Sequence, residues 1–336
     1  MPALLVTHFT RKPAAGAFSI ERVFRDVRAE MPAEVEVVEH RNAHLSQGVL
    51  PRLKDALTAR KASRAVNHVV GDVHYLTYFL PRRRTILTVH DTILVDRERG
   101  LKRIVLWFFW FWLPVRRSNR ITAISEKSRQ RLLELVSVDP TRVLVIPDPV
   151  SPEFTPQPPG PRRGPFRLLH IGGKANKNLE RLVRALNGLE VELTVIGHLS
   201  AVQKDLVAVH IAHHRLLENL DDKSLRAEYA RAEALVFVSL DEGFGLPILE
   251  AQASGRPVLT SARAPMNEVA GGAALLVDPE NVESMRGGVR RLISDPALRA
   301  SLVERGFINA VRFSVGNVAR QYADLYEAVG REAGDV

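Results

Sequence analysis

A proline-rich segment divides the chain into two parts. Between Pro149 and Pro165 the sequence is PVSPEFTPQPPGPRRGP. Proline fixes φ and has no amide hydrogen, so neither a helix nor a central strand can run through this segment. A chain of 336 residues is long enough for two domains. We therefore expect one domain over residues 1–150 and another over 166–312, joined by a linker over 151–165.

Short apolar runs alternate with helical patterns on both sides of this linker. The clearest runs are ALLVTHF near the N-terminus, TILTVHD (85–91), FRLLHIGG (166–173), VELTVIG (191–197) and ALVFVSL (234–240). Such alternation predicts parallel sheets covered by helices. The expected fold class is α/β, with two Rossmann-like doubly wound domains. Ligands of such domains bind at the carboxyl ends of the strands, so we expect the two domains to face a central cleft.

The stretch ALVFVSLDEGFGLPILEAQAS reads as a strand, a glycine-containing turn and a helix. Gly243 and Gly245 let the backbone approach a ligand closely, and the amides of residues 244–248 form a helix N-terminus that suits phosphate. Glu242 and Glu250 can reach the same small volume. Two carboxylates would repel a phosphate, so we interpret them as acceptors for sugar hydroxyls. The alternative is that they only stabilise the helix dipole.

Two further strand ends carry candidate residues. In HIGGKANKNLERL a helix is expected to begin near Lys177 and Asn178, with Asn178 as its cap. Lys177 is either a solvated lysine or a cation that neutralises a diphosphate. His90 follows TILTV, where a histidine has either a structural or a functional role. The adjacent Asp91 either caps the loop or contacts the acceptor substrate.

The run LRAEYARAEALVFVSLDEGFGLPILEAQASGRPVLTSARAPMNEVAGGAALLVDPEN resembles the donor-binding half of retaining glycosyltransferases of family 4, which have the GT-B fold. The likeness extends to HIGGKANKNLERL and TAISEKSRQRL, and more weakly to TVHD and the N-terminus. It implies an acceptor domain, a nucleotide-sugar domain, and a C-terminal segment (313–336). The helix in that segment, Val318 to Val329, would pack back on the N-terminal domain.

The resemblance also implies roles for the motif residues. Glu242 would contact sugar hydroxyls and Glu250 would hold the ribose, while the diphosphate would lie on Lys177. The amides that meet the sugar and the diphosphate would belong to Gly243, Phe244, Gly245 and Leu246.

Further donor contacts follow from the resemblance alone. His90 would contact the donor sugar, and Gly16 would lie in a glycine loop near the diphosphate. The family usually has an arginine after the strand glycine, where this chain has Gly173 and then Lys174. Lys174 would have to replace it without the bidentate fork of arginine.

A metal-independent reaction is expected, because no Asp-x-Asp motif stands at a strand end. Lysine and helix-end amides would stabilise the departing diphosphate. The resemblance implies retention by front-face attack, in which the leaving phosphate accepts the proton of the acceptor. We expect no cofactor and no metal, with a nucleotide diphosphate sugar as co-substrate.

An aromatic run, IVLWFFWFWLPV (104–115), holds all three tryptophans of the chain, Trp107, Trp110 and Trp112. The run is shorter than the roughly 20 apolar residues that span a bilayer. Basic residues flank it, among them Arg103, Arg116 and Arg117. The pattern fits either an interfacial membrane or acceptor contact, or a core or subunit-contact helix.

The distribution of charge along the chain favours the interpretation that this run contacts a membrane. Residues 1–150 hold 25 Lys and Arg against 15 Asp and Glu, whereas the rest hold 22 against 23. An anionic membrane or a nucleic acid would match this basic half. We predict no nucleic-acid partner, because the chain has no recognisable nucleic-acid motif.

The expected function is transfer of a hexose, for example mannose or glucose, to a saccharide or lipid-linked saccharide acceptor in glycan biosynthesis. The alternatives are a sugar-nucleotide epimerase or phosphorylase of the same fold, or a basic nucleic-acid-binding protein. The chain has no cysteine and its N-terminus does not read as a secretion signal. A cytoplasmic location is therefore expected, at the inner face of the cell membrane if the aromatic run docks there.

Overall fold

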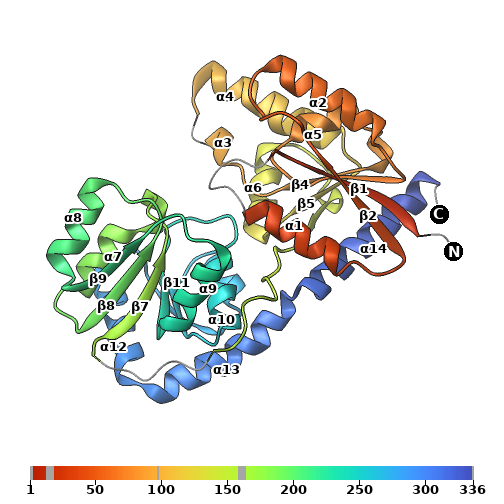
Figure 1. Ribbon diagram of the computed structural model, residues 1–336. Helices are drawn as coiled ribbons and strands as arrows, with labels where there is room; N and C mark the ends of the chain where they lie inside the picture. The colour runs from red at the N-terminus through yellow and green to blue at the C-terminus, as the bar shows by residue number, and fades with distance from the viewer. Residues whose placement is uncertain (1–2, 13–18, 97, 158–163, 335–336) are drawn as a thin grey trace. The chain divides into compact units, whose positions relative to one another are not determined.

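The computed structural model describes every residue except 1–2, 13–18, 97, 158–163 and 335–336. The chain forms two compact units, coloured in chain order in Figure 1. The first unit combines residues 1–149 with residues 315–336, and the second comprises residues 150–314.

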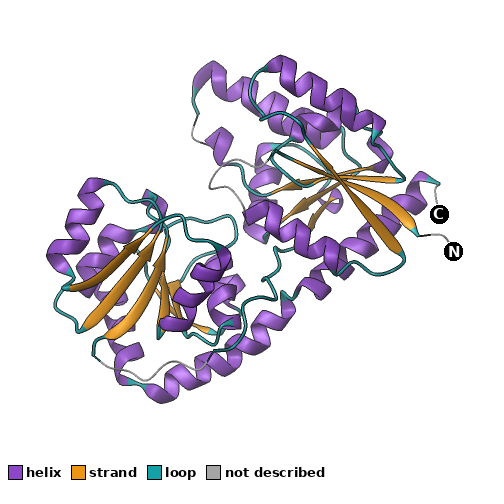
Figure 2. Cartoon of the chain, viewed as in Figure 1, coloured by secondary structure: helices purple, strands orange, loops and turns teal. Residues whose placement is uncertain are grey.

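The first unit contains a parallel sheet that has six strands in the described part of the chain, in the order β2-β1-β3-β4-β5-β6. Helices cover both faces of the sheet (Figure 2). The strands are β1 (Leu4–Thr10), β2 (Val35–Arg41), β3 (Val66–Val69), β4 (Thr85–Val89), β5 (Arg120–Ala123) and β6 (Val143–Val145). The helices are α1 (Ser19–Ala29), α2 (Val49–Lys61), α3 (Ile93–Asp96), α4 (Gly100–Leu106), α5 (Leu113–Arg116), α6 (Glu126–Leu135) and α14 (Val315–Ala333).

The two faces of this sheet differ in chemistry, because successive side chains of a strand point to opposite faces. Phe9 of β1 joins an apolar core with Ala56 of α2 and Val115 of α5. Its neighbour His8 lies on the other face, against Phe24 of α1. One face is therefore hydrophobic, and the other buries polar groups beneath α1 and α14.

The buried polar groups hold α14 to the sheet. The hydroxyl of Tyr326, on α14, lies 2.7 Å from Nε2 of His8 and 2.7 Å from Nδ1 of His68. His68 also hydrogen-bonds through Nε2 with Thr88 of β4, at 2.7 Å. Burial lowers the pKa of His8 well below its usual value and lowers the pKa of His68 to about 3. Both histidines are therefore neutral in the folded protein at neutral pH.

This burial predicts that acid weakens the first unit. An unfolded histidine gains its proton near pH 6.5, whereas His68 resists protonation down to about pH 3. The contribution of these histidines to the free energy of unfolding is thus fully present above pH 6.5. It is lost as the pH falls toward 3, by about 1.4 kcal/mol per pH unit for each such histidine. Urea unfolding between pH 7.5 and pH 5 measures this slope. A His68→Gln variant should show a shallower slope, and an unchanged slope would contradict the assignment.

The second unit contains another parallel sheet, with six strands among the described residues in the order β12-β11-β10-β7-β8-β9. Its strands are β7 (Phe166–Ile171), β8 (Val191–Ile196), β9 (His213–Leu217), β10 (Ala234–Phe237), β11 (Val258–Ser261) and β12 (Ala274–Val277). Its helices are α7 (Leu179–Leu186), α8 (Ala201–His210), α9 (Asp222–Arg231), α10 (Leu246–Ala253), α11 (Met266–Ala270), α12 (Val282–Ser294) and α13 (Pro296–Arg312). The chain reverses its direction of winding between β7 and β10, so the loops after these two strands meet where a doubly wound sheet binds ligands.

The second unit begins and ends at one place. The amide of Val150 donates to the carbonyl oxygen of Phe313 at 2.9 Å, and Val150 forms a parallel bridge with Ser314. Residues 151–157, the first part of the predicted linker, pack on this unit: the ring of Phe154 lies edge-on to Tyr229 at 5.3 Å. The predicted fold class, with two doubly wound α/β units, is confirmed.

Candidate functional site

The loops that follow β7 and β10 are joined by two hydrogen bonds. The amide of Leu240 donates to the carbonyl oxygen of Asn176 at 2.8 Å. The side-chain amide of Asn176 donates in return to the carbonyl oxygen of Asp241, also at 2.8 Å. Two loops that are far apart in the sequence thus form one continuous surface at the carboxyl edge of the sheet.

Lys177 and Glu242 meet across these two loops. Nζ of Lys177 lies 2.6 Å from Oε1 of Glu242, and both side chains are mostly buried. The ammonium group also lies 4.7 Å from the centre of the Phe237 ring, at the end of β10. A cation and a carboxylate, both predicted from the sequence, are therefore held at the switch point of the sheet.

The glycine turn continues from Glu242 into α10. Gly245 has a φ of 113° and precedes the first helical residue, Leu246. Among the described residues, no side chain caps this helix, so its first-turn amides keep the partial positive charge that attracts anions. The turn residue Phe244 is buried, edge-on to Phe313 at 5.9 Å.

The glycines after β7 permit a close backbone approach. A Cβ on Gly173 would lie 2.2 Å from the carbonyl oxygen of His198, and one on Gly172 would lie 2.7 Å from Cγ of Lys177. The carbonyl oxygen of Gly173 accepts a hydrogen bond from Gln203 of α8 at 2.8 Å. Gly173 therefore has a packing role, which positions the loop that carries Lys177.

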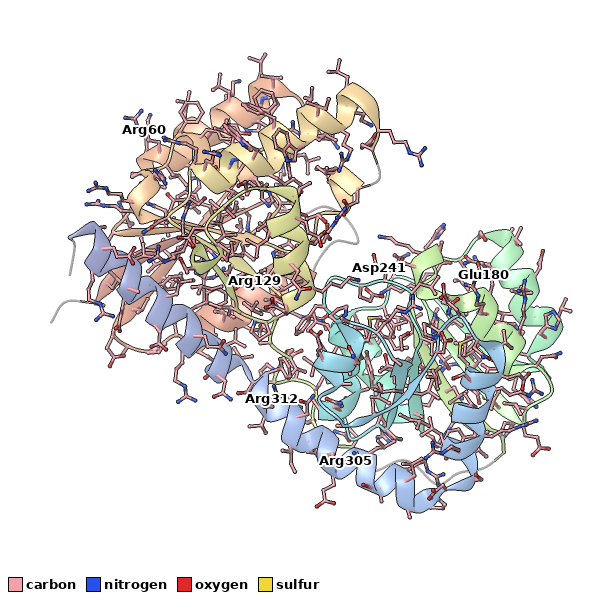
Figure 3. All side chains as sticks on the ribbon, turned by 180° about the vertical axis from the view of Figure 1, so that it is seen from behind. Arg60, Arg129, Glu180, Asp241, Arg305 and Arg312 are labelled. Atoms are coloured by element: carbon pink, nitrogen blue, oxygen red, sulfur yellow. The ribbon has the colours of Figure 1, made fainter. Side chains whose placement is uncertain are left out.

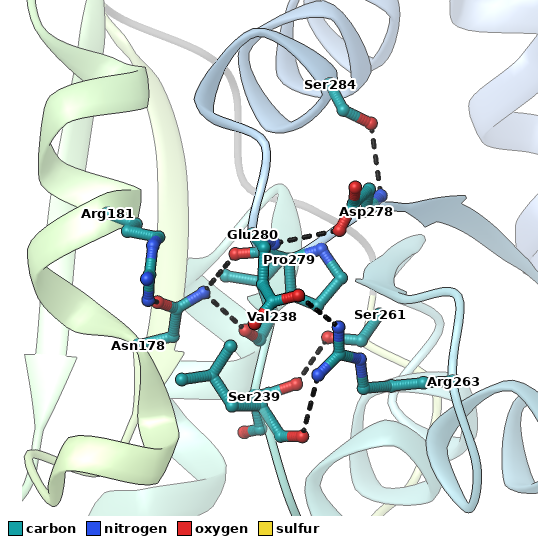
Figure 4. A network of polar contacts seen from close by, with 11 residues as sticks. Asn178, Arg181, Val238, Ser239, Ser261, Arg263, Asp278, Pro279, Glu280 and Ser284 are labelled. Carbon is teal, nitrogen blue, oxygen red and sulfur yellow. Dashed lines mark hydrogen bonds and ion pairs between the residues drawn. The ribbon is translucent and has the colours of Figure 1, made fainter.

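Asn178 does not cap α7 as expected. It has a left-handed backbone with a φ of 63°, which points its side chain away from the helix amides. Its Nδ2 donates instead to the carbonyl oxygens of Val238 and Pro279, at 3.1 and 2.7 Å (Figure 4). Arg263 donates to the carboxylate of Glu280 in the same network. Through these bonds the residue next to Lys177 is joined to the segments that follow β10 and β12.

Glu250 is buried on α10 and is held by a tyrosine. Oε2 of Glu250 accepts a hydrogen bond of 2.7 Å from the hydroxyl of Tyr229, which is itself buried. Sequence reasoning missed Tyr229, although the pattern LRAEYARAEA marks it as part of an amphipathic helix.

Lys174 differs from Lys177 in its surroundings. Its side chain is exposed, and it stands at the start of the short helical turn Ala175–Lys177. Glu180, in the first turn of α7, and Asp241, after β10, lie at the same edge of the second unit (Figure 3).

His90 lies in the first unit, directly after β4. Its Nε2 lies 3.0 Å from the carbonyl oxygen of Val70 and must donate to it, so this nitrogen carries a hydrogen. The ring is 7% exposed and lies edge-on to Phe24. Asp91 is exposed. Gly16 lies outside the described residues. A site shared by the two units stays a prediction.

Most residues of the aromatic run are buried or half-buried. This favours the interpretation that its tryptophans belong to the core. It forms the end of α4, a π-helical segment (Trp107–Trp112) and the start of α5. Trp110 is buried in the core, Nε1 of Trp107 donates to the carbonyl oxygen of Leu135, and Trp112 stacks on Phe108 with ring centres 4.9 Å apart.

The predicted docking arginines separate into two kinds. Arg103 and Arg116 are exposed, and Arg116 lies over the Trp112 ring at 4.5 Å. Arg117 donates to the carbonyl oxygen of Tyr78, so it has a structural role.

Within the described ranges, no helix is both long and apolar enough to cross a membrane. These residues also contain no group of three His, Asp or Glu side chains placed to hold a metal ion.

Family profiles match both parts of the chain. The profile described as glycosyltransferase family 4 matches residues 15–154, and the profile described as glycosyl transferases group 1 matches residues 156–308.

Curated relatives are similar over much of the chain. The O-antigen chain mannosyltransferase B of Escherichia coli is 26% identical over 285 residues, which are 76% of this chain and 73% of that protein. The MMP alpha-(1->4)-mannosyltransferase of Mycolicibacterium hassiacum is 29% identical over 274 residues, 74% of this chain and 66% of that protein.

Solved structures share the fold. Anabaena Alr3699/HepE in complex with UDP and glucose has a TM-score of 0.76 at 15% identity, covering 96% of this chain and 99% of that one. WaaG, described as a glycosyltransferase involved in lipopolysaccharide biosynthesis, has a TM-score of 0.67 at 16% identity, with 96% and 99% covered.

Proposed function

The chain belongs to glycosyltransferase family 4 and has the GT-B fold, and from this premise we propose that it is a retaining, metal-independent hexosyltransferase. The donor is a nucleotide diphosphate sugar, and the acceptor is a saccharide or lipid-linked saccharide in glycan biosynthesis. The observation that carries the proposal is the contact of 2.6 Å between Lys177 and Glu242 beside the glycine turn of α10. A cation, a hydroxyl acceptor and a helix N-terminus without a side-chain cap suit a sugar diphosphate.

The donor would lie on the second unit in a defined order. Its diphosphate meets Lys177 and the amides from Gly243 to Leu246, and its sugar hydroxyls donate to Glu242. Its ribose hydroxyls donate to Glu250, whose carboxylate Tyr229 orients. Lys177 and Glu242 contact each other. Donor binding would replace this ion pair by a contact of Lys177 with the diphosphate and a contact of Glu242 with the sugar hydroxyls. Lys174 and His90 would add outer contacts to the diphosphate and the sugar.

The reaction breaks the bond between the sugar C1 and the phosphate oxygen, and forms a bond from C1 to the acceptor oxygen on the same face. The acceptor proton passes to the departing phosphate. Lys177 and the helix amides stabilise the negative charge that develops on this phosphate. These groups can supply the positive charge themselves, which is the basis for proposing no metal and no cofactor.

The names of the relatives favour mannose as the transferred hexose, and the complex of Alr3699/HepE with UDP and glucose makes UDP-glucose the first alternative. We further propose a cytoplasmic enzyme on the inner face of the cell membrane, where its basic first unit would meet anionic lipid.

Donor binding is tested by a thermal-shift panel with UDP, GDP, ADP and their hexose derivatives. A ligand at a hundred times its Kd stabilises the folded state by about 2.7 kcal/mol, which raises the melting temperature by several degrees. We expect one nucleotide series to act, equally with and without EDTA. No shift from any of them would reject the donor assignment, and a shift that EDTA removes would reject the metal-independent reaction.

A further inference from the structure

A groove lies between α2 and the segment from α4 into the π helix, which run beside each other in the first unit (Figure 1). Its volume is about 510 Å³, which is within the range of small-molecule pockets. Val49 and Leu53 line one wall, and Val105 and Phe109 line the other. The groove is separate from Lys177 and Glu242, which belong to the other unit.

The lining is apolar except at one position. The two tyrosines that line the groove have their hydroxyls engaged: Tyr75 accepts from Asn42, and Tyr78 donates to the carbonyl oxygen of Phe109. Among the described lining residues, Arg52 is the only charged one. Its guanidinium lies 4.8 Å from the Trp110 ring and donates to the carbonyl oxygen of Ser46, while its buried Nε has no protein partner.

The two segments that line the groove are rich in apolar and basic side chains. On these segments Leu50 is 70% exposed and Leu101 is 75% exposed. The segments 49–61 and 100–117 contain a single carboxylate, Asp55, which is buried and bonded to His44. The same segments contain eight cationic residues: Arg52, Lys54, Arg60, Lys61, Lys102, Arg103, Arg116 and Arg117. Of these, Lys102 pairs with Glu98 at 2.6 Å and Arg117 donates to the carbonyl oxygen of Tyr78.

We propose that the groove takes one alkyl chain of an anionic membrane lipid, whose phosphate lies against Arg52. An alkyl chain needs no hydrogen bonds from the lining, whereas a peptide would bring backbone amides that require partners. A second copy of this chain would bring the same cations to the same surface and be repelled. An anionic lipid instead matches both the apolar groove and the cations of the two segments that line it. The inference extends the proposed membrane contact and does not depend on sugar transfer.

The test separates insertion into the groove from adsorption on the surface. Val105→Trp, and Leu53→Trp from the opposite wall, fill the groove but keep the surface apolar. Leu101→Ser removes exposed apolar surface outside the groove and is the matched control. Calorimetry with monomeric dodecyl phosphate should show one saturable site, and flotation with phosphatidylglycerol vesicles should show membrane binding.

We expect both tryptophan variants to abolish dodecyl phosphate binding and to reduce flotation, while Leu101→Ser keeps the single site. Arg52→Gln should weaken binding about tenfold, since it removes one charge-assisted contact. Inorganic phosphate alone should not bind. The proposal is overturned if both folded tryptophan variants, checked by circular dichroism, bind like the wild type. It is also overturned if phosphate binds equally well, or if sedimentation shows a dimer that the tryptophan variants dissociate.

Discussion

Replacing Lys177 by Met is expected to lower kcat/KM by about a hundredfold to a thousandfold, the usual effect of removing one donor that stabilises a developing oxyanion. The lysine carries the positive charge at the switch point, and its ammonium is held by Glu242 and Phe237. Steady-state kinetics of sugar transfer, with the donor identified by thermal shift, measure this effect. The loss should fall mainly on kcat, because the charge that Lys177 meets is largest in the transition state.

Glu242→Gln keeps the shape of its side chain but removes the charge, and it should also lose turnover. Because the two residues contact each other, the double variant should lose less than the product of the two single losses. Lys204→Met is the control: Lys204 is half-exposed and pairs with Glu218 on the same unit. If Lys177→Met behaves like Lys204→Met, the proposed role of Lys177 is wrong.

A methyl group on Gly173 is expected to destabilise the second unit by about 2–4 kcal/mol, as overpacked positions do. The new carbon would lie 2.2 Å from the carbonyl oxygen of His198 and 2.5 Å from Cδ2 of Leu199. Backbone cannot move aside as a flexible side chain can, so the loop that carries Lys177 must shift. Scanning calorimetry of Gly173→Ala should show a melting temperature lower by about 5–10 °C, together with weaker donor binding.

Gly287→Ala is the matched substitution, because a Cβ there has open space and Gly287 lies inside α12. Alanine favours a helix interior by up to about 1 kcal/mol over glycine, so this variant should melt at the same or a slightly higher temperature. Equal melting temperatures for the two variants would show that the loop after β7 tolerates a side chain.

The parts of the fold predicted from the sequence are those with a strong local pattern. β7 and α7 follow from FRLLHI and from the helical spacing of Leu179, Leu182 and Val183, which are all fully buried. β9 was missed, since HHRLL has no alternation of apolar and polar residues. Its place at the sheet edge explains this, because an edge strand has fewer neighbours and needs fewer apolar side chains.

The sequence suggested which charged residues form the candidate site, but not the contacts that hold them in place. Glu242 and Lys177 were proposed as site residues because a glycine turn between a strand and a helix is visible in the sequence. Their contact at 2.6 Å was not predictable, since it depends on β7 and β10 being neighbours in the sheet. The left-handed backbone of Asn178 was hidden for the same reason, as its partners are residues 238 and 279.

The composition of the aromatic run did not predict which of its residues are exposed. Its tryptophans suggested an interface, yet Trp110 is buried and Trp107 bonds to α6. The exposed apolar surface comes from aliphatic residues of α2 and α4, such as Leu50 and Leu101. The sequence could not reveal this, because only the fold brings these two segments to one groove.

The bridge between Val150 and Ser314 gives the second unit the topology of an inserted domain. The chain leaves the first unit after residue 149 and returns at residue 315, and both passages lie side by side. Inserted domains with adjacent ends can be excised or permuted without stretching the host chain. Residues 150–314 therefore define a natural fragment for expressing the second unit, which we propose binds the nucleotide sugar, while α14 must be rejoined to residues 1–149 for the first unit to be whole.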